Sequence, residues 1–272
     1  MPRQYSLAHL TVLGRAPPDV VHIAASCGYD FVGLRAIPLG LLREPRYVFR
    51  EDRALFRATR DALSATGVRL LDIEVAVIDS DREVRDYLPP LEDAAELGAR
   101  HVLCNGWGGE PAYIQEQFEA LCDLAAPLDI TVECEFVTFT KIVGLQDAVR
   151  IVAASGRANA GVLIDTLHFS RSRVTLEELD QVPRGLLHYL QICDGAFVEA
   201  PTVEELRRTA REERLYPGEG AAPIREIVER LPEAVLAIEI THAARVRELG
   251  YERFAQECLD RTRRYLGEGP AA

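Results

Sequence analysis

Short β-rich runs alternate with longer amphipathic segments along the whole 272-residue chain. The β-rich runs span residues 6–12, 31–34, 70–77, 101–104, 130–136, 161–165, 187–193 and 235–240. Segments with the 3.6-residue period of a helix follow them, at residues 17–27, 52–66, 82–97, 111–126, 145–155, 176–181, 224–230 and 244–266. Eight strand–helix pairs in a chain of this length predict an α/β protein with the (β/α)8 TIM barrel fold.

A doubly wound open sheet is the competing fold for such an alternation. It needs a glycine-rich fingerprint after an early strand, whereas the first strand–helix turn here has the sequence TVLGRAPPD. The composition does not change abruptly anywhere, and the one long irregular stretch, residues 195–220, follows the seventh β-rich run. We therefore expect a single barrel domain over residues 1–272.

The charge and cysteine content exclude several classes of protein. With 31 basic and 43 acidic residues the formal net charge is −12, which opposes binding to nucleic acid or to anionic membranes. Lys141 is the only lysine and lies outside any GxxxxGK[ST] sequence, so phosphate-loop and Schiff-base chemistry are disfavoured. The six cysteines are far apart without a CxxC pair, and no apolar run reaches the length of about 18 residues that a membrane helix needs. We expect a cytoplasmic protein with reduced thiols and with no nucleic-acid or membrane partner.

Acidic and amide residues end the last four predicted strands. They are Glu135, Asp165, Gln191 and Glu239. In a TIM barrel the carboxyl ends of the strands meet at one face, which carries the active site. Three carboxylates converging there repel one another, and a divalent cation removes that repulsion. Oxygen donors of this kind favour one Mn²⁺ or Mg²⁺ ion, with Co²⁺ or Zn²⁺ tolerated.

Five segments carry a family resemblance, namely CEFVTFT, GVLIDTLHF, LQICDG, RLYPGEG and LAIEI. They resemble the xylose isomerase-like TIM barrels, in particular the sugar phosphate isomerase/epimerase group. The resemblance implies that Glu135, Asp165, Gln191 and Glu239 hold the metal. It also places His168, from the Asp-x-x-His motif, beside the substrate, and directs Arg214 and Arg211 toward a substrate oxygen, carboxylate or phosphate. Barrels of this family often form homodimers or homotetramers, a point on which the residues themselves are silent.

The chain departs from the commonest family pattern at the seventh strand, where Gln191 replaces a histidine. Glutamine at this place also resembles the 3-dehydroshikimate dehydratases, which share the Asp-x-x-His motif and the PG-x-G turn. Those enzymes carry further polar residues after strands two and five, where this chain has the largely apolar GLRAIPLG and FVTFTKIVG.

The expected chemistry is proton transfer next to a metal-bound carbonyl, with Glu135 and Glu239 as acid and base on either flank of the substrate. One enediolate intermediate serves epimerisation, aldose–ketose isomerisation and dehydration. The leading hypothesis is an isomerase or epimerase of a keto-sugar, cyclitol or related polyol. The alternatives are a dehydratase of 3-dehydroshikimate type and a non-catalytic metal- or sugar-binding barrel, although the presence of both glutamates favours an enzyme. An abasic-site endonuclease, which shares the barrel, is disfavoured by the six histidines and the acidic charge.

Other polar residues have both a structural and a functional interpretation. Glu74 either contacts the substrate or makes a structural polar contact, and Arg35 either binds an anion or pairs with an acid. Trp107 either covers an apolar part of the substrate or packs its own loop. His188 is an odd number of residues from Gln191 and is therefore expected to face the surrounding helices. The charged run at residues 203–214 is expected to be a solvated helical face whose end brings its last two arginines toward the site.

Overall fold

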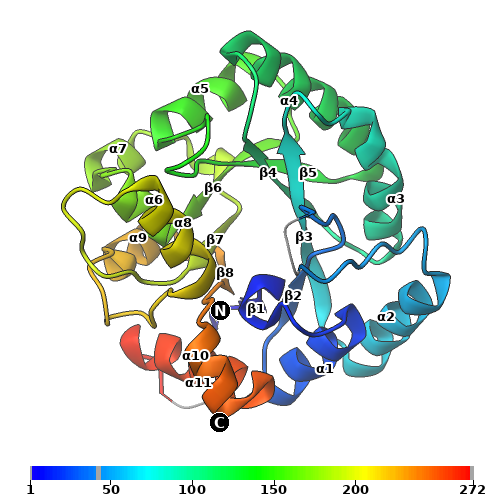
Figure 1. The fold of residues 1–272 in the computed structure, drawn as a ribbon, viewed down its shortest axis with the longest axis vertical. Helices are drawn as coiled ribbons and strands as arrows, with labels where there is room; N and C mark the ends of the chain where they lie inside the picture. Colours follow the sequence, from blue (N-terminus) through cyan, green and yellow to red (C-terminus); the bar gives the residue numbers. More distant parts are fainter. Residues whose placement is uncertain (1, 41–43, 270–272) are drawn as a thin grey trace.

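The computed structural model describes residues 2–40 and 44–269, and within these residues eight parallel strands close into one barrel in sequence order (Figure 1). The strands are β1 (Tyr5–Leu7), β2 (Phe31–Leu34), β3 (Arg69–Ile78), β4 (His101–Gly106), β5 (Thr131–Glu135), β6 (Ala160–Asp165), β7 (Tyr189–Ile192) and β8 (Val235–Ile238). The ring closes where β8 pairs with β1, with Ser6 opposite Ala237 and Leu7 opposite Ile238. The single-domain (β/α)8 barrel predicted from the alternation is confirmed.

The helices form a ring outside the strands (Figure 1). The α-helices are α1 (Pro17–Cys27), α2 (Arg53–Thr66), α3 (Leu88–Glu96), α4 (Pro111–Ala125), α5 (Leu145–Ser155), α6 (Thr166–Arg171), α7 (Leu176–Asp180), α8 (Val203–Glu212), α9 (Ile224–Arg230), α10 (Ala243–Leu249) and α11 (Tyr251–Tyr265). Short 3₁₀ helices are η1 (His9–Val12), η2 (Val84–Tyr87), η3 (Ala126–Leu128) and η4 (Arg184–Leu186). In the described part of the chain no helix combines the length and apolar character needed to cross a membrane.

The helical pattern differs from the prediction at three places. The segment expected as one helix at 244–266 is broken at Gly250, whose φ of +77° ends α10 before α11 begins. The stretch expected to be irregular contains α8, which begins with a capping box between Thr202 and Glu205. The pattern also missed α6, because this six-residue helix is buried over its first four positions and has no polar face to give a period.

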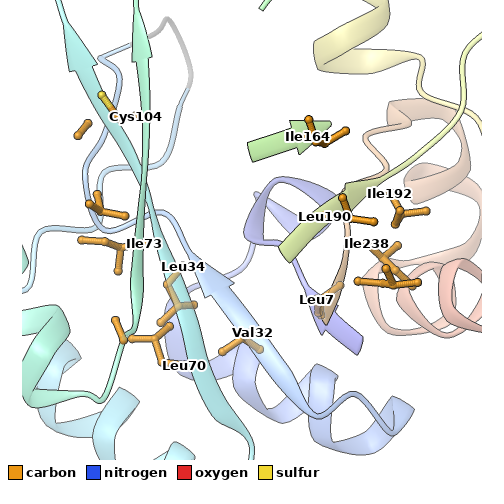
Figure 2. Close-up of a cluster of buried hydrophobic side chains, with 14 of the residues drawn as sticks. Leu7, Val32, Leu34, Leu70, Ile73, Cys104, Ile164, Leu190, Ile192 and Ile238 are labelled. Carbon is orange, nitrogen blue, oxygen red and sulfur yellow. The ribbon is translucent and has the colours of Figure 1, made fainter. Parts of the chain in front are cut away.

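Alternate positions on the strands form the layer between barrel and helices. Figure 2 shows members of this layer, among them Leu7, Val32, Leu34, Leu190, Ile192 and Ile238, all fully buried. The intervening positions face the inside of the barrel, as alternation along a strand requires. A smaller apolar cluster, with Leu71, Val75, Leu103, Leu163 and Tyr189 among its members, fills the middle of that interior. The interior is therefore a packed core with polar groups above and below it.

The cysteines behave as small buried hydrophobic residues. All six are buried, and no disulfide joins them within the described residues. Burial raises the pKa of each thiol, most strongly at Cys104 and Cys258. The thiols are thus kept protonated and unreactive.

One histidine lies elsewhere than predicted. The ring of His188 does not face the helices. Its Nδ1 lies 2.8 Å from Oε1 of Glu133 at the base of the barrel, where the amino ends of the strands meet. The prediction was wrong because His188 precedes β7, so the alternation that holds inside a strand does not extend to it.

Candidate active site

The four strand-end residues singled out in the sequence all lie at the mouth of the barrel, the face formed by the carboxyl ends of the strands. Glu135 ends β5, Asp165 ends β6, Gln191 lies in β7, and Glu239 follows β8 directly. All four side chains are buried. The fold therefore brings three carboxyl groups and one amide into a water-poor space.

Arg214 lies among these acids. Its Nη1 is 2.6 Å from Oδ2 of Asp165 and 2.8 Å from Oε2 of Glu239, and its Nε donates to the carbonyl of Ala210 at 2.8 Å. The side chain is only 3% exposed. The arginine expected to meet a substrate oxygen thus contacts two of the predicted metal ligands, and it also lines the pocket.

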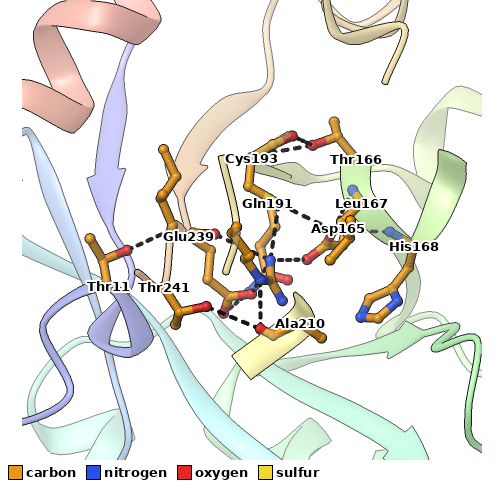
Figure 3. A network of polar contacts seen from close by, with 12 residues as sticks. Thr11, Asp165, Thr166, Leu167, His168, Gln191, Cys193, Ala210, Glu239 and Thr241 are labelled. Atoms are coloured by element: carbon orange, nitrogen blue, oxygen red, sulfur yellow. Dashed lines mark hydrogen bonds and ion pairs between the residues drawn. The ribbon is translucent and has the colours of Figure 1, made fainter. Parts of the chain in front are cut away.

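Gln191 completes this group from β7. Its Nε2 donates to Oε1 of Glu239 at 3.0 Å, and Figure 3 shows this contact within the network that joins Asp165 and Glu239. Its Oε1 is buried and has no hydrogen-bond partner among the described residues. Oε1 of Gln191 is therefore a buried acceptor that a hydrogen-bond donor or a cation could satisfy.

Glu135 ends β5, the strand that pairs with β6 and therefore lies next to the strand of Asp165. One ligand atom from each of Glu135, Asp165 and His168 can be chosen so that all lie within 4.8 Å of one another, close enough for a shared cation. Asn105 donates to Oε2 of Glu135 at 3.2 Å, and Oγ1 of Thr138 lies 3.1 Å from Nδ1 of His168. Sequence reasoning missed these two supporting residues, whose one signal was a polar side chain at or just after the end of β4 and β5.

The proton affinities of the site follow from burial and from the neighbouring charges. Burial, with Asp165 and Glu239 close by, raises the pKa of Glu135 well above its usual range. Burial likewise raises the pKa of Glu239 to about 8, although Arg214 opposes the shift. Burial alone would raise the pKa of Asp165 too, but Arg214 and His168 hold it below its usual value. Burial lowers the pKa of His168 to about 4, so this ring is neutral at physiological pH.

These residues fit a divalent cation. Among the described residues Arg214 is the guanidinium that contacts Asp165 and Glu239, so about two negative charges stay uncompensated when Glu135, Asp165 and Glu239 are all ionised. The orphaned oxygen of Gln191 adds a neutral donor, and an all-oxygen set of this kind suits a hard ion. The mouth is thus a candidate metal site.

A second ion-pair network borders the first. Arg35 donates from Nη2 to Oε2 of Glu74 at 2.9 Å and lies 3.3 Å from Oε1 of Glu44. Of the two interpretations of Arg35, pairing with an acid is the one observed. Glu74 also lines the pocket, and its Oε1 is buried without a hydrogen-bond partner in the described residues.

The pocket above these groups has a volume of about 260 Å³. Its remaining wall is largely apolar, formed by Leu10, Leu13, Leu39, Val75, Leu103, Val137 and Phe139. Trp107 and Arg211 also line it, with the guanidinium carbon of Arg211 lying 5.7 Å from the centre of the indole ring. Both residues therefore border the space of the pocket.

The loop that carries Arg214 is fixed by Asp194. The carboxylate of Asp194 accepts hydrogen bonds from the backbone amides of Gly195, Gly218, Gly220 and Ala222, at 2.8 to 3.0 Å. Asp194 and Leu215 also exchange two backbone hydrogen bonds, and the amide of Arg214 donates to the carbonyl of Thr241 at 2.8 Å. The PGEG turn and this strand-end acid therefore position Arg214 through the backbone.

The chain belongs to the xylose isomerase-like TIM barrel family, whose model matches residues 21–259. A curated relative, the inosose isomerase of Bacillus velezensis, is 24% identical over 148 residues, which cover 51% of this chain and 51% of that protein. The matched region thus spans about half the length of this relative.

Solved structures share the whole barrel. The crystal structure of the IOLI protein with a bound zinc atom matches with a TM-score of 0.80 at 19% identity, covering 97% of this chain and 98% of that chain. D-Psicose 3-epimerase with D-tagatose, from Clostridium cellulolyticum H10, matches with a TM-score of 0.71 at 15% identity, covering 98% of this chain and all of that chain. At these identities the likeness shows the fold.

Proposed function

We propose that the protein is a divalent-metal-dependent isomerase or epimerase that acts on a small keto-sugar, cyclitol or related polyol. The observation that carries the proposal is the pair of buried carboxyl groups, Glu135 and Glu239, which both line one pocket and both have a raised pKa. A pKa of about 8 places Glu239 of the metal-free protein near the working pH, and a group with such a pKa exchanges protons efficiently in both directions. The inosose isomerase relative supports the choice of substrate class.

The residues that would hold the cation are Glu135, Asp165, Gln191 and Glu239. When bound, a divalent cation polarises a carbonyl group and stabilises the negative charge that develops on its oxygen. Oxygen donors favour Mn²⁺ or Mg²⁺ over softer ions. Zn²⁺ and Co²⁺ belong in the same comparison, because a solved structure with this fold contains zinc.

Glu135 and Glu239 perform the proton transfers in this proposal. They end β5 and follow β8, with β6 and β7 between them, so they reach the pocket from two sides. One carboxylate removes the proton from the carbon next to the carbonyl, and the electron pair moves into an enediolate. The other carboxyl group returns a proton, to the opposite face in an epimerisation or to the neighbouring carbon in an isomerisation.

The neighbouring side chains orient the reacting groups. Arg214 keeps Asp165 ionised and fixes one oxygen of Glu239, while Gln191 fixes the other. The neutral ring of His168, held by Thr138 at Nδ1, hydrogen bonds with a substrate hydroxyl without adding charge. The apolar wall packs against the C–H faces of the substrate and excludes water.

The test is hydrogen exchange in D₂O. Protein stripped with a chelator is reloaded with Mn²⁺, Mg²⁺, Co²⁺ or Zn²⁺ and incubated with inososes, ketohexoses and their phosphates, and the products are examined by NMR. The expected result is metal-dependent incorporation of deuterium next to the carbonyl in an otherwise unchanged or isomerised skeleton. An ultraviolet-absorbing product from 3-dehydroshikimate would instead establish the lyase, and metal binding without exchange on any substrate would indicate a non-catalytic barrel.

A further inference from the structure

A second cluster of ionisable side chains lies at the base of the barrel, at the opposite end from the mouth. Glu133 is two residues before Glu135 on β5, so it also points into the barrel, and it is fully buried. His101 begins β4, and His188 immediately precedes β7. Ligand atoms of these three residues lie within 4.8 Å of one another.

Two imidazole nitrogens converge on one carboxylate oxygen in this cluster. Nδ1 of His101 lies 2.7 Å from Oε1 of Glu133, and Nδ1 of His188 lies 2.8 Å from the same atom. The first contact has the geometry of a hydrogen bond. In the second, Nδ1 of His188 lies at ion-pair distance without the angles of a hydrogen bond, and Oε2 of Glu133 has no partner among the described residues.

The unpaired Oε2 of Glu133 needs an explanation, because a buried carboxylate oxygen without a partner is costly. A cation bound by the carboxylate and by Nδ1 of both imidazoles, in place of the hydrogen bond between His101 and Glu133, would satisfy Nδ1 of His188 and Oε2 of Glu133 together. Two imidazoles and one carboxylate are also the ligand set of open zinc sites.

Gly161 leaves the room that the side chains of Glu133 and His188 need in order to approach each other. This residue of β6 lies between Glu133 on β5 and His188 before β7, and a Cβ at its position would be 2.3 Å from Oε2 of Glu133 and 2.6 Å from Nδ1 of His188. His101 and His188 also line an open pocket on the base, together with Leu187, Leu231 and Pro232. An ion can therefore reach the cluster from the side opposite the mouth.

We propose that His101, Glu133 and His188 form a second metal site, for a borderline transition-metal ion such as Zn²⁺. The nitrogen-rich donor set distinguishes it from the all-oxygen set of the mouth. An ion at this place joins β4, β5 and the start of β7 across the glycine of β6, at the barrel face associated with stability. The role of the site is therefore structural, and it is independent of the reaction proposed for the mouth.

The test is metal binding to chelator-stripped protein in which Asp165→Asn has weakened the mouth site. Zn²⁺ is titrated by calorimetry, and Co²⁺ is titrated by visible absorption, which reports nitrogen ligation. We expect one ion per chain and a rise in melting temperature of about 5 °C or more when zinc is at a hundred times its Kd. Adding His188→Gln removes a ligand and should weaken zinc binding by at least ~10–100-fold, which is the loss that removal of an outer-shell partner already causes. The matched control is His22→Gln, at an exposed position of α1, which should change nothing.

Two outcomes would overturn the proposal. The first is that the Asp165→Asn protein takes up no zinc or cobalt. The second is that neither His188→Gln nor His101→Gln changes its affinity. Should the variants fail to fold by circular dichroism, a crystal of the wild-type protein soaked in zinc decides the matter: anomalous density between His101, Glu133 and His188 supports the site, and its absence while the mouth holds zinc refutes it.

Discussion

Glu133 and Glu135 lie on one strand and point into the same barrel interior, about 6–7 Å apart along β5. Both are buried, yet their pKa values are shifted in opposite directions. Two imidazoles hold the pKa of Glu133 below its usual range, whereas burial beside Asp165 and Glu239 raises the pKa of Glu135 well above it. Burial acts to raise the pKa of both groups, and the charge of the nearest neighbours decides whether the net shift is upward or downward.

The same contrast separates the two ends of the barrel. At the mouth, the acids outnumber the arginine that contacts them, and the pKa values of Glu135 and Glu239 are raised. At the base, a carboxylate is matched by nitrogen donors, an arrangement that holds strands together. Four predictions test this comparison, from the largest expected effect to the smallest.

Glu239→Gln should lower kcat by about 10²–10⁴-fold, because the amide cannot transfer the proton. Circular dichroism should show an intact fold, since the substitution preserves the shape of the side chain. Glu213→Gln, at an exposed position next to Arg214, is the control and should keep normal turnover. Full activity of Glu239→Gln would remove the acid–base role of the mouth.

Arg214→Met should destabilise the metal-free protein by about 3–5 kcal/mol, because it leaves Asp165 and Glu239 buried without their cation. Urea denaturation gives the free energy of unfolding, and added Mn²⁺ should restore part of the loss. The control is Arg208→Met, whose ion pair with Glu213 is about half exposed and should be worth less than about 1 kcal/mol. Equal losses in the two variants would contradict the charge imbalance described at the mouth.

The pH dependence of stability should have opposite signs at the two ends. The pKa of Glu239 is raised from 4.5 to about 8, so its stabilising contribution is complete below the lower value and is lost as pH rises through about 8. The pKa of Glu133 is lowered, so its contribution is present above the usual value and is lost as pH falls.

Urea denaturation of the metal-free wild type, Glu239→Gln and Glu133→Gln across pH measures both effects. Glu239→Gln should gain stability relative to the wild type as pH rises toward 8. The deficit of Glu133→Gln should shrink as the solution becomes acidic. Parallel curves for the three proteins would show that the neighbours of the two glutamates do not matter.

Arg211→Gln should have the smallest effect, a rise in KM of up to about tenfold for phosphorylated or carboxylated substrates and no change for neutral ones. Arg211 lines the pocket beside Trp107 and is half-buried, so its charge is partly screened. Steady-state kinetics on matched neutral and anionic substrates provide the measurement. An equal change for both kinds would mean that Arg211 supports Trp107 and does not contact the substrate.

The barrel and the position of its polar face could be predicted from the sequence because both depend on local periods. Alternating strands and helices define the ring, and the end of a strand is visible in the sequence of that strand. For this reason Glu135, Asp165, Gln191 and Glu239 were expected at the mouth and lie there. Their roles in metal binding and catalysis remain predictions.

Contacts between residues far apart in the sequence could not be predicted in this way. The position of Arg214 between Asp165 and Glu239 depends on a loop fixed by Asp194, and the sequence marks only the turn in that loop. The place of His188 depends on the end of η4 and on a glycine in β6, neither of which affects the period of its own strand. Such contacts arise from packing of the whole ring.

The backbone pairing of Asp194 with Leu215 brings together the two ends of the segment between them, so this segment is a closed loop. Next to this pairing, the amide of Arg214 donates to the carbonyl of Thr241, so the ends of the loop that contains α8 are fixed. Lengthening a closed loop costs little, about 0.6 kcal/mol for each doubling. Changes of length within residues 196–209, which precede the pocket-lining Ala210 and Arg211, should therefore leave the acids of the mouth in their positions.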